Sequence, residues 1–409
     1  MTAPAPTLSI VDADSHVTEP PDVWTARVST KWGDLVPHVK SVESTSGISV
    51  GDGAESLSFG QKREMEFWFI GDHQIATACG SAMAGWAEPF PSHPPTFADA
   101  DPACYDATAR VAVLDASGIA SQVLYPNVGG FGSERFRTMP DPRLALECVR
   151  AYNDFLIDWS APHSDRFIPI AALPYWDIDA AVNEIERAVN IGHRGVIFPG
   201  APHEWDQPYL ADRHWDRLWA AAQAAGLPVS FHTGSGNFTA HLNPTRIALE
   251  GIEAAFTRAS TAIFLDSAVQ MNDLLLSGVL ARFPDLQFVS VESGIGWLPF
   301  VLESADYHFH VAGVRAAHPE FELLPSEYFR RQVFACSWFE HAGMTSLLDL
   351  VGVENVLFET DFPHPTCLAG PQVRSAADAA FGDQPAEVRH KVLYANAARL
   401  YGLFDTAHS

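Results

Sequence analysis

Short apolar runs alternate with helix-like segments along most of the chain. Each run has the length of a strand, and after it the apolar residues recur at the three- and four-residue spacing of an amphipathic helix. Continuous apolar runs are typical of parallel strands that are buried on both faces. The runs occupy residues 8–11, 122–126, 167–174, 195–199, 228–232, 286–292, 333–337 and 356–361. This order predicts a (β/α)8 TIM-type barrel of the α/β class.

Helical spacing between the runs predicts the helices of this barrel. Gly118 and Gly226 each follow such a segment directly, as glycine does at the C-terminal end of a helix. The predicted helices cover residues 106–117, 141–160, 180–190, 214–225, 245–260, 268–282, 297–310 and 341–350.

The pattern changes between residues 38 and 95, where alternating and Ser-rich segments replace the rhythm of strand and helix. Residues 66–70 are predicted to form a strand that enters a hairpin turn at residues 71–72. We therefore expect two parts. Residues 1–37 and 96–409 form the barrel, and residues 38–95 form a small β-rich insertion after the first strand.

Composition and charge narrow the class of protein. A formal net charge of −25 repels nucleic acids and anionic membranes, so neither is expected as a partner. The sequence contains no apolar run of about 18 residues and no signal-peptide pattern, so we expect no membrane span and no secretion. The five cysteines are odd in number and lack a C-x-x-C spacing, which indicates free thiols in a reducing cytoplasm.

Polar side chains of the kinds that bind metal ions follow the apolar runs at four strand ends. These residues are Asp14 and His16 after the first run, His232 in the fifth, Glu292 in the sixth and Asp361 in the eighth. The C-terminal ends of barrel strands meet at one mouth, so these side chains should converge there. One polar residue at a strand end is more often a hydrogen-bonded core group, but three converging carboxylates would repel one another without a cation. The pattern predicts a divalent-metal site.

Three motifs carry a resemblance to a known family: Asp14-x-His16, Phe231-His232-Thr233 and Thr360-Asp361-Phe362-Pro363. They resemble the amidohydrolase superfamily, in the branch that includes aminocarboxymuconate semialdehyde decarboxylase. The likeness extends from residue 11 to about residue 403. The resemblance implies a metal-dependent TIM barrel. Because this branch contains decarboxylases, hydratases and hydrolases of C–C, ester and thioester bonds, the reaction stays open.

Two departures from the pattern of the branch change the expected metal site. Many members have histidine at the position of Asp14, and the decarboxylase has histidine at the position of Glu292. No lysine stands at residues 199–200, where other amidohydrolases have a carbamylated lysine that bridges two ions. Glu292 could supply that bridge, so we expect two ions of iron, zinc or manganese. Their expected ligands are Asp14, His16, His232, Glu292 and Asp361.

The preferred hypothesis is metal-dependent hydrolysis. A metal-bound water reaches a pKa of ~7 and attacks as hydroxide. The resemblance gives Asp361 the task of moving that water's proton, with Glu292 as the second catalytic group. The chain resembles a related group that includes a diiron acyl-CoA thioesterase, so the thioester of a bulky acyl-CoA is the first expected substrate, and hydrolysis of another bond stays open. Aromatic residues near the predicted mouth suit a bulky acyl group, although most such residues are core: Trp24, Phe231, Phe238, Trp297, Phe309 and Trp338.

The alternative hypothesis is a metal-dependent non-oxidative decarboxylase or hydratase of an aromatic or unsaturated carboxylic acid. Its proton donor would be Glu292 or His310. A barrel kept only as a binding or scaffold protein is disfavoured, because it would not need metal-suited residues at four strand ends. The resemblance further implies a homodimer. The residues expected to contact a small-molecule substrate are Trp297, His310, His364 and Phe231.

Overall fold

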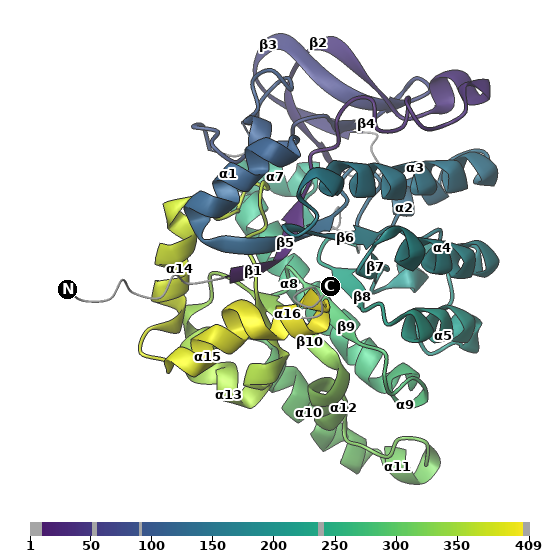
Figure 1. Ribbon diagram of the computed structural model, residues 1–409, viewed down its shortest axis with the longest axis vertical. Coiled ribbons are helices and arrows are strands. Elements are labelled where there is room, and N and C mark those ends of the chain that lie inside the picture. The colour runs from purple at the N-terminus through teal and green to yellow at the C-terminus, as the bar shows by residue number, and fades with distance from the viewer. Residues whose placement is uncertain (1–9, 51–54, 90–91, 236–240, 404–409) are drawn as a thin grey trace.

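Eight parallel strands form the centre of the molecule in the computed structural model, which describes residues 10–50, 55–89, 92–235 and 241–403 (Figure 1). Within this sheet each strand pairs with the next one along the chain. The strands are β1 (Ile10–His16), β5 (Ile119–Tyr125), β6 (Phe167–Ala171), β7 (Gly195–Ile197), β8 (Val229–His232), β9 (Phe288–Val291), β10 (Val333–Ser337) and β11 (Val356–Phe358).

The first and last strands meet, so the sheet nearly closes into a barrel. Ser15 of β1 forms a parallel bridge with Phe362, and the backbone N–H of His16 donates to the carbonyl of Phe362 at 2.6 Å. The N–H of Asp361 donates to the carbonyl of Asp14 at 3.0 Å. The predicted TIM-type barrel is therefore confirmed, because the apolar runs pair as parallel strands in sequence order.

Strand β1 extends well beyond the apolar run that predicts it. The run covers residues 8–11, of which 8 and 9 lie outside the described residues, whereas β1 continues to His16 and is buried throughout. The carboxylate of Asp12 can be buried in this strand because it accepts two hydrogen bonds. Gln122 Nε2 donates to it at 2.7 Å, and the backbone N–H of Thr360 donates to it at 2.8 Å. Buried polar groups that are hydrogen-bonded cost little, so polar residues continue the strand to the mouth of the barrel.

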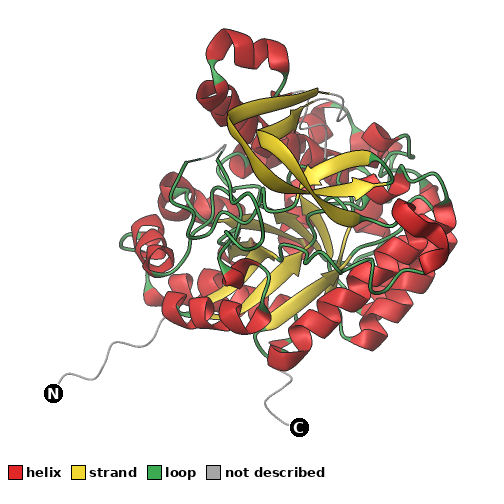
Figure 2. Cartoon of the chain, turned by 90° about the horizontal axis from the view of Figure 1, so that it is seen from above, coloured by secondary structure: helices red, strands yellow, loops and turns green. Residues whose placement is uncertain are grey.

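Helices surround the strands, as the view from above shows (Figure 2). None of those in the described ranges is both long and apolar enough to cross a membrane. The helices are α1 (Ala107–Ser117), α2 (Glu134–Arg137), α3 (Pro142–Ser160), α4 (Ile178–Ile191), α5 (Asp216–Ala225), α7 (Pro244–Glu250), α8 (Ile252–Leu276), α9 (Val279–Arg282), α10 (Leu298–Val311), α11 (Val314–Ala317), α12 (Pro325–Gln332), α13 (Leu348–Val351), α14 (Pro371–Phe381), α15 (Ala386–His390) and α16 (Asn396–Leu400).

The helices after β8 differ from the prediction of two helices over 245–260 and 268–282. The chain breaks at Gly251, where φ is 81° and ψ is 159°, a conformation that glycine adopts readily and other residues do not. Beyond it, α8 continues without interruption to Leu276. Its buried residues include Ala255, Ala259 and Met271, which are spaced in multiples of four along one face and hold the helix against the barrel.

A separate three-stranded antiparallel sheet lies between β1 and α1 in the sequence and beside the barrel in space (Figures 1 and 2). Ile70 pairs with His73, so the predicted hairpin turn is present as a two-residue connection. After this sheet, the N–H of Met83 donates to the carbonyl of Pro363 at 2.8 Å, which places the segment against the loop that follows β11. The domain boundaries at residues 38 and 95 stay a prediction. The strands are β2 (His38–Val50), β3 (Glu55–Ile70) and β4 (His73–Thr77).

Candidate metal centre

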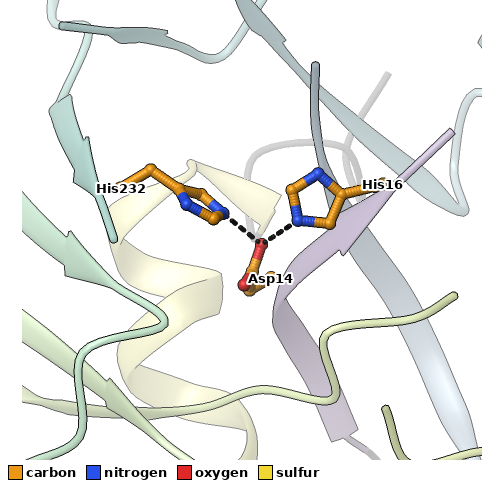
Figure 3. A group of neighbouring side chains, drawn as sticks. All are labelled: Asp14, His16 and His232. Atoms are coloured by element: carbon orange, nitrogen blue, oxygen red, sulfur yellow. Dashed lines mark ion pairs between the residues drawn. The ribbon is translucent and has the colours of Figure 1, made fainter. Parts of the chain in front are cut away.

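Side chains from the first, fifth and eighth barrel strands converge at the C-terminal end of the barrel. The Oδ1 atom of Asp14 lies 3.4 Å from Nε2 of His16 and 3.4 Å from Nε2 of His232 (Figure 3). His16 Nε2 also lies 3.6 Å from Oδ1 of Asp361, which follows β11. The two histidines point at the same carboxylate from opposite sides, so the predicted convergence of these four residues is present in the structure.

The ring nitrogens that face this space carry no proton when the histidines are neutral. His232 Nδ1 donates to the carbonyl of Thr233 at 2.7 Å, and His16 Nδ1 donates to the carbonyl of Pro126 at 3.3 Å. A carbonyl only accepts, so the proton of each neutral ring is on Nδ1, and each Nε2 presents a lone pair. Metal-binding histidines are typically oriented in this way.

Polar atoms in the centre of the cluster lack hydrogen-bond partners among the described residues. They include both carboxylate oxygens of Asp14, His16 Nε2 and His232 Nε2. All three side chains are fully buried. Buried polar groups without a partner are rare because each costs about 1–3 kcal/mol. Two imidazole nitrogens and one carboxylate thus point their lone pairs into the same space. These are ligand types that bind divalent cations.

Glu292 and Asp361 reach the cluster from backbone positions that non-glycine residues seldom adopt, with φ of 53° and 56°. Hydrogen bonds hold both. The N–H of Glu292 donates to Oε2 of Glu359 at 3.0 Å, and Thr366 Oγ1 donates to Oδ2 of Asp361 at 3.0 Å. Strained backbone at a strand end is characteristic of functional sites, where neighbouring groups over-determine the conformation. Here it turns the Glu292 Oε2 atom to within 3.7 Å of His232 Nδ1.

His364 joins the cluster on the side of β11. Its Nδ1 atom lies 2.8 Å from Oδ1 of Asp361, and its ring stacks on His16 with 3.8 Å between the centroids. Its Nε2–H donates to Oδ1 of Asn127 at 2.6 Å. The orientation of the Asn127 amide is fixed, because its Nδ2 donates to the carbonyl of Val17 at 2.9 Å. His364 therefore has a polar partner at each ring nitrogen, the amide oxygen of Asn127 at Nε2 and the carboxylate of Asp361 at Nδ1.

The electrostatics of the cluster are those of a crowded acidic site. Burial raises the pKa of Asp14 above its ordinary value. Burial raises the pKa of Glu292 further, and Asp361, Asp14 and Glu359 add to the effect by repulsion. Burial lowers the pKa of His16 well below its ordinary value, and His364 and His232 lower it further. Close carboxylates beside neutral histidines favour a bound cation, which would relieve the repulsion among the carboxylates.

Three sets of residues could each hold an ion, with ligand atoms within 4.8 Å of one another. They overlap, because Asp14, His16 and Asp361 each belong to two of them. The residue types fit a divalent metal, and the unpartnered buried atoms give that fit a physical reason. The sets are Asp14, His16 and His232; His16, Asp361 and His364; and Asp14, Glu292 and Asp361.

Sequence reasoning missed the residues that support the cluster. Asp12 accepts hydrogen bonds from Gln122 and Thr360, and its burial raises its pKa to about 7. The Oε1 atom of Glu19 accepts from the backbone N–H groups of Asn127 and Val128, at 2.8 and 3.0 Å. A signal existed for Asp12, which precedes Asp14 by two residues and so shares its strand face. No sequence signal indicates Asn127, because it is brought to the site by a loop.

Two residues predicted to contact substrate, Phe231 and His310, lie elsewhere. Phe231 packs into the core, 5.5 Å from the ring of Phe288, because neighbouring residues of a strand point to opposite faces and His232 points inward. His310 is exposed on α10 and has no described contact with the cluster. Trp297 is half-buried, and its Nε1 donates to the carbonyl of Ser293 in the loop after β9.

The other aromatic residues of the predicted mouth are mostly core. Trp24 is fully buried and packs edge-on against Trp68. Phe309 and Trp338 are also buried. Phe238 lies outside the described residues. Four of the six aromatic residues named for a bulky acyl group, Trp24, Phe231, Phe309 and Trp338, are therefore buried.

The chain is similar in sequence to proteins of named activity and similar in fold to several solved structures. The chain is 26% identical over 318 residues to gamma-resorcylate decarboxylase of Rhizobium sp. strain MTP-10005, an alignment that covers 72% of this chain and 86% of the relative. An amidohydrolase from Mycobacterium avium subsp. paratuberculosis K-10 has a similar structure, with a TM-score of 0.71, 22% identity, and coverage of 96% of this chain and 99% of that one. Dihydroxybenzoic acid decarboxylase from Polaromonas sp. JS666, solved with bound manganese, gives a TM-score of 0.57 at 22% identity and covers 73% and 87%.

These relatives contradict the prediction of thioester hydrolysis. Three of the curated relatives that match are gamma-resorcylate decarboxylases, so the comparisons favour the alternative hypothesis. The physical reason for the error lies in Glu292, which was interpreted as a ligand of a second ion. A carboxyl group beside a metal can equally transfer a proton, and carboxylate and imidazole ligands serve hydrolases and lyases alike.

The family itself is established by a broader match. The family model described as Amidohydrolase matches residues 11–403, which is nearly the whole chain and includes every member of the cluster. The barrel topology and the residues at its strand ends agree with this match. The chain therefore belongs to the amidohydrolase family.

Proposed function

We propose that this protein is a metal-dependent, non-oxidative decarboxylase of a hydroxylated aromatic carboxylic acid. The observation that carries the proposal is the match to gamma-resorcylate decarboxylase over 72% of the chain. The convergence of Asp14, His16 and His232 on one buried space supports it, because such a site can hold the divalent ion that a decarboxylase of this kind needs.

The metal would be held by Asp14, His16, His232 and Asp361 through the atoms that converge in the structure. Manganese is the preferred candidate, because it is bound in the Polaromonas dihydroxybenzoic acid decarboxylase. When bound, the ion supplies positive charge that attracts the substrate's carboxylate and an adjacent hydroxyl oxygen. Elemental analysis of the purified protein decides whether it binds one ion or two, and whether the metal is manganese, iron or zinc.

Glu292 is the proposed proton donor. Decarboxylation breaks the bond between a ring carbon and the carboxylate, releases CO2, and needs one proton at the same carbon. The side chain of Glu292 is 13% exposed, whereas those of Asp14 and His232 are fully buried, so Glu292 can face both the substrate and the solvent that returns its proton. Glu359 holds the backbone N–H of Glu292 and so fixes its position. His310 is too exposed on α10 for this role.

Asp361, His364 and Trp297 are proposed to orient the substrate. His364 touches both His16 and Asp361, so its ring borders the space beside the ligand atoms. Trp297 lies in the segment after β9 that also carries Glu292, and its indole Nε1 donates to the carbonyl of Ser293. We further propose a homodimer in the cytoplasm. The described cysteines are free thiols, which fits a reducing compartment.

The test is a decarboxylation assay on protein of known metal content. Purified wild-type protein is loaded with Mn²⁺ and offered 2,6-dihydroxybenzoate, 5-carboxyvanillate and related hydroxybenzoates, while CO2 and the arene product are measured. We expect equimolar CO2 and arene from at least one acid, and loss of turnover when a chelator removes the metal. A fully metal-loaded protein that releases no CO2 from any member of the panel would contradict the proposal.

A further inference from the structure

A carboxylate on the segment after β10 holds the segment that carries Glu292. Glu340 Oε2 accepts from the backbone N–H of Ile295, and Glu340 Oε1 accepts from that of Gly296, both at 2.7 Å. The hydroxyl of Ser337, the last residue of β10, donates to Oε2 at 2.7 Å and so orients the carboxylate. Hydrogen bonds from a backbone N–H to a carboxylate are shorter and stronger than those between neutral groups. Glu340 therefore fixes the course of the backbone three and four residues beyond Glu292.

The two segments are packed tightly around this carboxylate. A β-carbon at Gly296 would lie 2.9 Å from Oε1 of Glu340, and one at Gly294 would lie 3.2 Å from the same carboxyl group. Both distances are shorter than ordinary van der Waals contact, so a residue larger than glycine would push the carboxylate away. The side chain of Ile295, between the two glycines, is fully buried. The backbone of this segment is thus fitted closely to the carboxylate that holds it.

The segment that follows β9 contains backbone that needs support. Glu292 and Gly294 both have left-handed conformations, with φ of 53° and 68°. A non-glycine residue keeps such a conformation only when its surroundings over-determine it. On the side of β9, Oε2 of Glu359 accepts from the N–H of Glu292 at 3.0 Å. On the side of α10, Glu340 provides two of the hydrogen bonds that hold the segment. Loss of these two bonds should let the backbone at Glu292 relax.

We propose that Glu340 is a positioning residue for Glu292. Among the described residues, Glu340 belongs to none of the three candidate metal sets, so it acts through the backbone of the segment after β9. Its role depends on the proposed function, in which Glu292 gives the proton to the ring carbon that loses CO2. A displacement of about 1 Å in a reacting group can lower a rate about 10²-fold, so the position of this segment controls turnover.

The kinetic test compares Glu340→Ala and Glu340→Gln with wild type, all loaded with Mn²⁺. Alanine removes both acceptors, whereas glutamine keeps one oxygen. We expect kcat for decarboxylation to fall about 10-fold or more in Glu340→Ala and less in Glu340→Gln, while KM and the Mn²⁺ dissociation constant change less than about 3-fold. Glu327→Ala is the matched control, because Glu327 Oε2 also accepts from a backbone N–H, that of Leu324 at 2.7 Å, but at the start of α12. It should leave kcat unchanged, and circular dichroism checks that each variant is folded.

A double variant separates positioning from a general structural role. If Glu340 acts only through Glu292, the variant with both Glu292→Gln and Glu340→Ala should have the kcat of Glu292→Gln alone, within about 2-fold. Independent effects would multiply, so that kcat of the double variant would be about 10-fold lower again. Multiplied effects, a Glu340→Ala variant with the kcat of wild type, or a lower kcat explained by loss of Mn²⁺ would each overturn the proposal.

A crystal structure of Glu340→Ala gives a readout that needs no substrate. In the wild type, Oε2 of Glu292 lies 3.7 Å from Nδ1 of His232. We expect this distance to change by about 1 Å or more when the two hydrogen bonds to Glu340 are lost. An unchanged Glu292 would overturn the proposal. A wild type that releases no CO2 would contradict the proposed function, whereas this distance would still decide whether Glu340 positions Glu292.

Discussion

The Nε2 atom of His232 lies 3.4 Å from the Oδ1 atom of Asp14, and in the neutral ring no proton lies between them. The proton of the neutral ring is on the other nitrogen, Nδ1, which donates to the carbonyl of Thr233. Two lone pairs that face each other in a buried space repel unless a cation sits beside both. This relationship is the physical basis for the proposed metal centre.

Asp14→Asn should lower metal affinity at least 100-fold and abolish turnover. The substitution keeps the shape of the side chain but removes the charge that faces both histidines. In the metal-free protein the same change should raise the melting temperature, because it removes a buried carboxylate whose pKa is raised by burial. Titration calorimetry with Mn²⁺ and differential scanning calorimetry measure the two effects. Asp285→Asn, at an exposed position, is the control and should change neither. Unchanged affinity in Asp14→Asn would remove this residue from the ligand set.

Glu292→Gln should lower kcat by about 10²-fold or more, because the amide cannot donate an acidic proton. Metal content decides between the two expectations for this residue. One ion per chain in both wild type and variant supports proton transfer alone, whereas a fall from two ions to one supports a bridging ligand. Elemental analysis and the CO2 assay are made on the same samples. Glu303→Gln, at an exposed position of α10, serves as the control. Normal kcat in Glu292→Gln would exclude it as the donor.

Much of this centre could be predicted from the sequence, because parallel strands in a barrel bring their C-terminal ends together. That rule alone is sufficient to place Asp14, His16, His232 and Asp361 near one another. The same kind of rule could have excluded Phe231, since it neighbours the inward-facing His232 on a strand.

Other features could not be predicted in this way. Asn127 and Glu19 reach the site through loops, whose paths depend on tertiary contacts rather than on periodicity. The break at Gly251 and the continuity of α8 depend on packing against the barrel, so the boundaries of the helices after β8 were misplaced. The type of reaction could not be predicted from the sequence either, because the same ligand types serve hydrolysis and decarboxylation.

Asn127→Leu should lower kcat/KM by about 10-fold, while Asn127→Asp should retain most of it. The leucine removes the acceptor for Nε2 of His364 and leaves its ring free to turn away from Asp361. The aspartate keeps an oxygen that accepts from Nε2 of His364 but loses the donor to the carbonyl of Val17. Metal binding should change less than turnover in both variants, since Asn127 touches none of the four proposed ligands of the ion. Steady-state kinetics and Mn²⁺ titration separate the effects. Equal kinetics for wild type and Asn127→Leu would show that the hydrogen bond does not position His364.

His193 gives the protein a pH-dependent stability away from the metal centre. It is buried, its Nε2 lies 3.2 Å from the carbonyl of Asn153, and burial lowers its pKa to about 4. The unfolded chain binds a proton as the pH falls through about 6.5, whereas the folded chain binds it only near pH 4. The free energy of unfolding should therefore decrease between these pH values, by up to roughly 3 kcal/mol. Urea denaturation at several pH values measures the slope. His193→Asn should flatten it, and the exposed-site control His310→Asn should not.

We propose that four side chains from three strand ends share one divalent ion. Anomalous diffraction from crystals grown with Mn²⁺ tests it most directly. We predict a manganese peak bounded by Asp14 Oδ1, His16 Nε2, His232 Nε2 and Asp361 Oδ1. A fully occupied manganese peak elsewhere, or an empty space between these atoms at saturating Mn²⁺, would contradict the account.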